Sequence, residues 1–312
     1  MNLGIATAAY SEVVVTVLVT GATGFVGRRL VTTLAERGDT VRAMTRRPAD
    51  YEGPGDPVYG DVDDPDSLSE ALHGVTVAVY LVHSLGDDDF ERKDAEAARA
   101  FGRAAAGCGV QQIVYLGGLG ADDDQLSPHL RSRREVEECL GEAGVPVTVL
   151  RAAIVVGAGG ISWEITRQLV KNLPAMVVPK WVATRTQPIA LDDVVVYLAG
   201  VIGNDEAKDR VFDIGGPDVL TYLDMMRQAA AEMGRRVPPI LTVPVLTPSL
   251  SSHWIAFVTD VDTTTAKNLI DSMSTEVVVT DGDAVRAVVP HQPMTYRESV
   301  RKALRDAEAV AS

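Results

Sequence analysis

Three glycines, Gly21, Gly24 and Gly27, follow an apolar stretch near the start of the chain. The stretch from Val13 to Thr20 is rich in β-branched residues, which favours a buried strand. After the glycines, apolar residues recur at helical spacing until Gly38, where a helix would end. The glycines are therefore predicted to lie in a turn that leads from a strand into a helix.

A turn of this kind can bind a diphosphate. The first glycine permits the tight turn, the second lets backbone amides approach the phosphates, and the third lets the helix pack on the strand. The N-terminus of the helix adds free N–H groups and the positive end of its dipole. We therefore expect a nicotinamide dinucleotide here, bound by the three glycines together with Thr23, Phe25 and Val26. The alternative is a glycine-rich turn that binds no ligand.

Two arginines bear on the choice of dinucleotide. An acidic residue that binds the ribose diol of NAD often follows the second strand, about 20 residues after the turn. Here Thr45 is followed by Arg46 and Arg47, whose guanidinium groups suit a 2′-phosphate and favour NADP, with NAD possible. The alternative is a solvated pair of loop arginines. Asp61, with Val62 beside it, is placed to bind the adenine amino group, unless it is an ordinary turn aspartate.

Composition excludes several classes of protein. The 312 residues are 46% hydrophobic and 23% charged, which supports a packed core and argues against disorder. A formal charge of −14 opposes nucleic-acid binding. The two cysteines, Cys108 and Cys139, fit neither a disulfide scaffold nor a metal site. Prolines interrupt the apolar tract from Val237 to Val258 and no signal peptide is recognisable, so we expect a cytoplasmic protein without metal or membrane span.

Strand and helix patterns alternate along the first half of the chain. Further strands are predicted at Thr40–Thr45, Val58–Gly60, Val75–Val82, Ile113–Leu116 and Val147–Leu150, with helices over Ser67–Leu72, Asp94–Ala106 and from Ser127 onward. Such alternation predicts an α/β fold, a Rossmann-type doubly wound parallel sheet. Ligands of such sheets bind at the carboxyl ends of the strands, where the candidate residues fall.

The pattern loosens in the second half. We assign residues 1–156 to a dinucleotide-binding region, with residues 185–216 returning to the sheet layer through pieces at Gln187–Leu198 and Val211–Ile214. Residues 157–184 and 217–312 are predicted to form a smaller, interleaved C-terminal substrate or lid region, because glycines, prolines and longer spacings replace the alternation. No pattern predicts the oligomeric state.

The chain resembles the atypical short-chain dehydrogenase/reductases. Four motifs carry the likeness: Thr20–Gly27, Gly60–Asp61, Leu81–Ser84 and Thr186–Ala190. Within that superfamily the chain is similar to the NmrA-like NAD(P)H-binding proteins through Ser132–Glu137 and Gly144–Arg151. The resemblance implies a Rossmann fold, a substrate pocket under the C-terminal part, and a nicotinamide cofactor near Leu81, Val82, Gly117 and Ala152. We expect His83 and Gly118, which adjoin these residues, to contact the cofactor as well.

The resemblance does not extend to the usual catalytic residues, a serine after the fifth strand and a Tyr-x-x-x-Lys pair on the next helix. The segment Leu116–Leu119 has no hydroxyl, and His129 and Arg133 stand where the tyrosine and lysine would be. Because an imidazole near its ordinary pKa of about 6.5 can donate a proton, we expect His129 to be the proton donor. Arg133 would hold the cofactor ribose, a phosphate or an anionic substrate oxygen. Alternatively, both are polar residues of an exposed helix, with Arg133 in a surface ion pair, and His83 is a second candidate for proton transfer.

The substrate side is predicted from composition. The loop Gly157–Glu164 should pass over the crevice, with Glu164 facing the substrate or serving as an ordinary helix carboxylate. Several other residues lie in the same region and could line the pocket or belong to the core and surface: Pro179, Lys180, Trp181, Arg185, Met225, Met226, Trp254 and Phe257. Few fixed charges occur there, which favours a small apolar or aromatic substrate.

These observations lead to two hypotheses about function. The first is an NADP-dependent oxidoreductase without the usual Ser-Tyr-Lys triad, which passes hydride to an apolar carbonyl, enone or quinone. Similar short-chain proteins occur in aromatic polyketide tailoring, as quinone reductase or monooxygenase components. The second, favoured by the missing triad, is a non-catalytic NmrA-like NAD(P)H sensor or regulatory protein. Turnover of the reduced cofactor by apolar acceptors separates the two.

Overall fold

The computed structural model describes residues 15–83, 89–120, 126–172, 176–178, 180–235, 240–242 and 273–311. A parallel sheet of seven strands forms the centre, in the order β11-β6-β5-β4-β1-β2-β3. Its strands are β1 Thr16–Val19, β2 Thr40–Thr45, β3 Asp56–Tyr59, β4 Val77–Tyr80, β5 Gln112–Gly118, β6 Val147–Ala152 and β11 Val211–Ile214. The predicted Rossmann-type sheet is confirmed.

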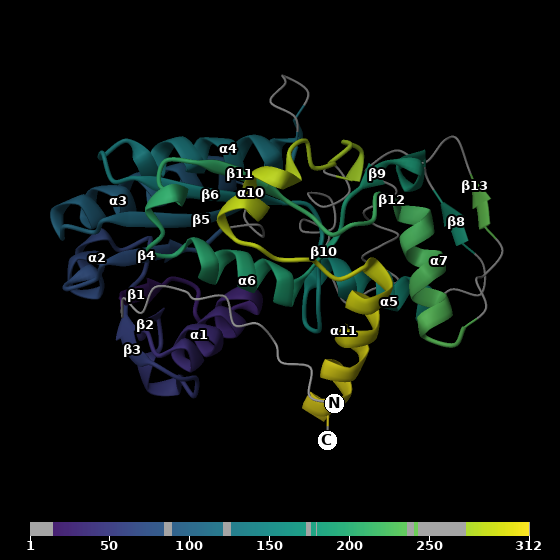
Figure 1. The fold of residues 1–312 in the computed structure, drawn as a ribbon, viewed down its shortest axis with the longest axis horizontal. Helices are drawn as coiled ribbons and strands as arrows, with labels where there is room; N and C mark the ends of the chain where they lie inside the picture. The colour runs from purple at the N-terminus through teal and green to yellow at the C-terminus, as the bar shows by residue number, and fades with distance from the viewer. Residues whose placement is uncertain are drawn as a thin grey trace.

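Helices cover both faces of this sheet (Figure 1). One face packs against α2 Pro65–Leu72, α3 Phe90–Gly107 and α4 Pro128–Gly141 through a buried cluster that includes Tyr80, Phe101 and Tyr115. The other face packs against α1 Phe25–Arg37, α6 Leu191–Val201 and α10 Gly282–Val288. Strand residues alternate between the two clusters, as the period of a strand buried on both faces requires.

A third apolar cluster lies beyond the sheet. It joins α5 Ile161–Asn172, α7 Tyr222–Glu232 and α11 Tyr296–Ala311, with Trp163, Met225 and Met226 among its buried side chains. Short strand pairs accompany it: β7 Val155–Val156 with β10 Ile189–Ala190, β9 Arg185–Thr186 with β12 Leu220–Thr221, and β8 Met176–Val178 with β13 Ile240–Thr242. The boundaries proposed for the substrate region stay a prediction.

One sequence-based element differs from the structure. Gln187–Leu198 was predicted as a piece of the sheet layer, but it contains the two-residue strand β10, outside the central sheet, and most of α6. Its run of β-branched valines is buried because α6 packs on the sheet face, so apolar content alone did not separate a buried helix from a strand. The prediction at Val211–Ile214 is confirmed as β11 at the edge of the sheet.

Asp193 on α6 fixes the chain that leads into the last helix. Its buried carboxylate accepts hydrogen bonds from the backbone N–H of Met294 at 2.9 Å and contacts the Nε2 atom of His291 at 2.7 Å. The ring of His291 also meets Tyr197 edge to face. Through these contacts the C-terminal segment is held on the sheet domain. Among the described residues, no helix is both long and apolar enough to cross a membrane.

Candidate functional site

The glycine turn has the geometry that a diphosphate site requires. Gly21 has a positive φ of 60°, and the N–H of Gly24 donates to its carbonyl at 2.8 Å. A Cβ atom at Gly27 would lie 2.2 Å from the Gly21 carbonyl oxygen, so only glycine permits this approach of helix to turn. Helix α1 begins at Phe25 with no side-chain cap, which leaves its first N–H groups available to a ligand.

Thr20 joins the turn to the neighbouring strand end. Its buried hydroxyl accepts from the N–H of Leu81 at 2.8 Å, and its own N–H donates to the Val79 carbonyl at 3.0 Å. These bonds place the end of β4 beside the glycine turn. A ligand bound at the turn therefore continues past Leu81 toward the middle of the sheet edge.

A cavity of about 1210 Å³ opens at this edge. Its volume exceeds the roughly 300–1,000 Å³ of a typical small-molecule pocket, so it has room for a dinucleotide and a second ligand. Every residue assigned to the site from the sequence lines it: Gly21, Thr23, Gly24, Phe25, Val26, Gly27, Arg46, Arg47, Asp61, Val62, Leu81, Val82, His83, Gly117, Gly118, His129, Arg133 and Ala152. Whether these residues bind a cofactor stays a prediction.

Other lining residues were not assigned to the site from the sequence. Some lie in the last residues of a strand or within four residues after it, and this position could have identified them: Met44, Thr45, Gly60, Asp63, Leu116, Leu119, Ala153 and Ile154. Gly160, Ile161 and Ser162 come from the loop that was expected to cover the crevice. Tyr222, Met273 and Val277 are brought in from distant parts of the chain. No local pattern marks these last three.

Arg46 and Arg47 lie at one end of the cavity with exposed side chains. The hydroxyl of Thr45 accepts from the N–H of Arg47 at 3.2 Å, which fixes the backbone after β2. Within the described ranges neither guanidinium has an ion-pair partner, so both are free to meet a phosphate. One carboxylate oxygen of Asp61 accepts from the N–H of Asp63 at 3.1 Å, and this bond is that of a turn aspartate.

Helix α4 positions His129 and Arg133. Ser127 caps it, its hydroxyl accepting from the N–H of Leu130 at 3.3 Å, and Pro128 occupies the first turn, as predicted. The helix lies close against the end of β5, where a Cβ atom at Gly118 would stand 2.8 Å from a Leu130 methyl carbon. This close approach brings both predicted side chains to the cavity wall.

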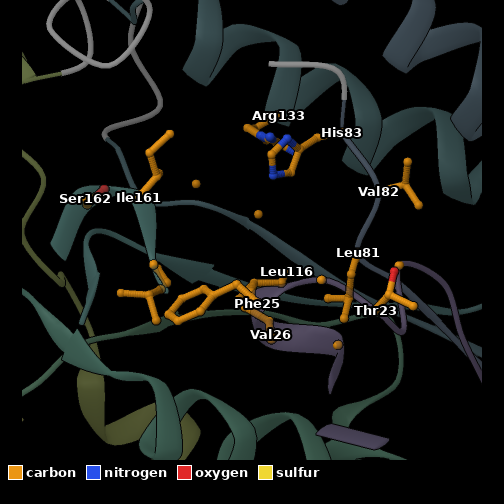
Figure 2. Close-up of a pocket in the computed structure, with 18 of the residues that line it drawn as sticks. Thr23, Phe25, Val26, Leu81, Val82, His83, Leu116, Arg133, Ile161 and Ser162 are labelled. Carbon is orange, nitrogen blue, oxygen red and sulfur yellow. The ribbon is translucent and has the colours of Figure 1, made fainter. Parts of the chain in front are cut away.

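Arg133, His83 and His129 line one side of the cavity, which we call the basic wall. Figure 2 shows Arg133 and His83 together, across the cavity from Phe25 and Leu116. The charge of Arg133 acts on both His83 and His129. Arg133 is only 6% exposed, so the alternative of a surface arginine is wrong.

The surroundings of His129 also change the ionisation on which its expected role as a proton donor rests. Burial and the Arg133 cation lower its pKa from 6.5 to about 3, so the ring is neutral near pH 7 and cannot act as an imidazolium donor there. The pKa of His83 also lies well below its ordinary value, first because desolvation disfavours the charged ring and then because the Arg133 cation repels it. The role of either histidine in proton transfer stays a prediction.

The opposite end of the cavity is mainly apolar. Its walls come from the chain after β6, the start of α5, the start of α7 and the segment before α10: Ala153, Ile154, Val155, Gly160, Ile161, Ser162, Tyr222, Met273 and Val277. Ile161 keeps 39% of its surface exposed, which is unusual for a large apolar side chain. A Cβ atom at Gly160 would lie 2.6 Å from the Phe25 ring, so this end packs directly on the glycine turn.

For several substrate-side residues the structure agrees with the core or surface alternative and not with the pocket role. Glu164 does not line the cavity and pairs with Arg167, as an ordinary helix carboxylate would. Arg185 pairs with Glu276 at 2.7 Å on the exposed surface. Met225 and Met226 belong to the third core cluster. Pro179, Trp254 and Phe257, together with the side chains of Lys180 and Trp181, lie outside the described part.

Comparisons with known proteins agree with this geometry. The model of the family described as NAD(P)H-binding matches residues 21–176. The (4-alkanoyl-5-oxo-2,5-dihydrofuran-3-yl)methyl phosphate reductase of Streptomyces griseus subsp. griseus is 31% identical over 231 residues, 70% of this chain and 74% of that protein. Ceramide reductase of Caulobacter vibrioides is 29% identical over 248 residues, 73% of each chain.

A solved structure shares the fold over nearly the whole chain. The NADPH-dependent quinone oxidoreductase from Escherichia coli, complexed with NADPH, has a TM-score of 0.73 at 21% identity. The match covers 91% of this chain and 98% of that one. The central sheet and the helices around it are therefore arranged as in that protein.

Proposed function

The chain belongs to the NAD(P)H-binding family, within the atypical, NmrA-like short-chain reductase group, and we propose that it transfers hydride from NADPH to an apolar, electron-poor substrate. One observation carries the proposal: a single cavity joins the glycine turn to the apolar end formed by residues such as Ile154, Ile161 and Val277. A dinucleotide site and a site for a second, apolar molecule are thus continuous.

The cofactor end fits NADPH by its chemistry. The tight approach at Gly27 and the uncapped N-terminus of α1 suit the diphosphate. Arg46 and Arg47, which carry no ion pair within the described residues, suit the 2′-phosphate and favour NADPH over NADH. When bound, the reduced cofactor supplies the hydride.

The protein then contributes mainly the position of the acceptor. The apolar end holds the acceptor beside the strand ends, with Ser162 and Tyr222 as the hydroxyl-bearing side chains of that lining. Hydride adds to an electrophilic carbon of a carbonyl, enone or quinone, the π electrons move to oxygen, and one proton balances the reduction. Because His129 is neutral near pH 7, its ring can donate a hydrogen bond, while the proton itself comes from solvent.

The relatives support this choice of reaction. One is named as a reductase of an unsaturated lactone that carries an alkanoyl group, and the structural neighbour is named as a quinone oxidoreductase. Both names describe electron-poor acceptors. A quinone from aromatic polyketide tailoring would fit the same cavity, and that role stays a prediction.

The experiment measures binding and turnover with both cofactors. Fluorescence titration gives the affinities for NADPH and NADH, and absorbance at 340 nm follows oxidation of the cofactor with a panel of quinones and enones. We expect the double variant Arg46→Ala, Arg47→Ala to bind NADPH about 10- to 100-fold more weakly, with NADH affinity almost unchanged. The matched control is Arg103→Ala, Arg131→Ala, which removes two exposed charges outside the cavity lining.

Two results would contradict the proposal. If the control double variant weakens NADPH as much as the test variant, the preference comes from overall charge and not from a phosphate site. If NADPH binds tightly but no acceptor in the panel is reduced, the protein binds the dinucleotide without turnover. The sensor hypothesis would then replace the reductase.

A further inference from the structure

Arg133 is a buried cation whose counter-charge is missing from the described residues. Its exposed fraction is 6%, yet its guanidinium makes no ion pair there. The next arginine along α4, Arg134, shares the carboxylate of Glu137 with Arg151, at 3.0 and 2.7 Å. A guanidinium removed from water is normally paired. The basic wall therefore provides a charge that the described protein does not neutralise.

The groups around Arg133 are uncharged near pH 7. On the cavity side these are the imidazoles of His83 and His129, both of which the Arg133 cation helps to keep neutral. Behind it lie the phenols of Tyr80 and Tyr115, whose pKa values are raised by burial, and the Arg133 guanidinium acts on both phenols in the opposite direction.

Three acidic side chains act on this region, and one of them, Asp63, lines the cavity. Asp94 on α3 interacts electrostatically with both phenols, and Glu137 on α4 is already bound by two arginines. Within the part of the chain that the structure describes, none of the three has an ion pair with the Arg133 guanidinium. The acidic groups on these elements therefore leave the cavity face of Arg133 available.

The anionic groups of a dinucleotide have other positions in the cavity. The diphosphate suits the N-terminus of α1, and the 2′-phosphate suits Arg46 and Arg47. These are the negative charges of NADPH. A third cationic site, on the wall opposite Phe25 and Leu116, is available to the second ligand (Figure 2).

We propose that Arg133, flanked by the hydrogen-bonding rings of His83 and His129, binds an anionic oxygen group of the substrate, a carboxylate or a phosphate ester. This inference rests on the proposed function and narrows its substrate class: an apolar, electron-poor molecule that carries one acidic group. The planar guanidinium donates two parallel hydrogen bonds to such a group. The apolar end of the cavity takes the rest of the molecule.

The test uses probes that cannot be reduced. The protein saturated with NADP⁺ is titrated with 2-naphthoate, 2-naphthyl phosphate and neutral 2-methoxynaphthalene, which share one ring system, and calorimetry gives each dissociation constant. We expect both anions, or one of them, to bind the wild type more tightly than the neutral probe. Arg133→Gln should weaken the anions about 10- to 100-fold and leave the neutral probe unchanged. Arg133→Lys should restore part of the preference, because it keeps the charge and loses the fork.

Controls separate this role from a structural or cofactor role. Arg131→Gln removes an exposed charge from the same helix, outside the cavity lining, and should leave all three constants unchanged. Thermal unfolding of Arg133→Gln shows whether the variant is folded at the temperature of the titration, since it also loses the contact between the guanidinium and Tyr115.

Other outcomes overturn the inference. Equal binding of anionic and neutral probes by wild type would do so, as would retained anion preference in Arg133→Gln. A selective loss of NADP⁺ affinity in that variant would assign Arg133 to the cofactor. Because the probes are never reduced, an inactive protein that still binds them through Arg133 would refute the reductase and not the anion site.

Discussion

The ionisation of His129 decides which proton source the site can use. The structure lowers its pKa to about 3, and an unfolded chain would return it to about 6.5. Between about pH 6.5 and pH 3, the His129 ring therefore binds a proton in the unfolded state but not in the folded state. Stability present at neutral pH is lost as pH falls through this window, down to about pH 3.

The size of this loss can be worked out. When the pH falls from 7.5 to 5.5, a histidine with these two pKa values lowers the free energy of unfolding by about 1.4 kcal/mol. His129→Gln removes that dependence. The free energy of unfolding of the wild type should therefore fall by about 1.4 kcal/mol more than that of the variant over this range.

Urea unfolding at a series of pH values measures this difference. The matched control is His73→Gln, which replaces an exposed histidine outside the cavity lining. A nuclear magnetic resonance titration of the His129 ring gives an independent reading, with no midpoint between pH 5 and 8. The ring would not be neutral as argued if the free energies of unfolding of the wild type and His129→Gln changed equally with pH, or if the ring titrated near pH 6.5. His129 could then act as a proton donor.

Two further substitutions test the elements that hold the site. Gly27→Ala places a methyl group 2.2 Å from the Gly21 carbonyl oxygen, so urea unfolding should show a loss of more than about 2 kcal/mol. Fluorescence titration should also show weaker binding of NADPH. A variant with wild-type unfolding and wild-type NADPH affinity would refute that packing. Asp193→Ala leaves the Met294 N–H without its acceptor and removes the contact to His291, so urea unfolding should show a loss of about 2–3 kcal/mol, whereas a loss below 0.5 kcal/mol would mean that the C-terminal segment is held by its apolar contacts.

Local sequence patterns predicted much of the fold and the cofactor end of the cavity. β-Branched runs marked the strands because such residues suit a sheet buried on both faces, and β2 was predicted with its observed bounds. The three glycines predicted a turn, and backbone geometry requires glycine at Gly21, which has a positive φ, and at Gly27, where a Cβ atom would lie 2.2 Å from the Gly21 carbonyl oxygen. Since ligands of parallel sheets bind at the carboxyl ends, residues after those ends could be assigned to one cavity before any contact was known.

The tertiary structure decided what depends on contacts between distant residues. Tyr222, Met273 and Val277 reach the apolar end only because the third core cluster folds against the sheet. The ionisation of His129 depends on burial and on the neighbouring Arg133, neither of which its position on a helix reveals. That Arg133 has no ion pair among the described residues is likewise set by which carboxylates the fold brings near it. A sequence lists charges, and only packing determines which of them are neutralised.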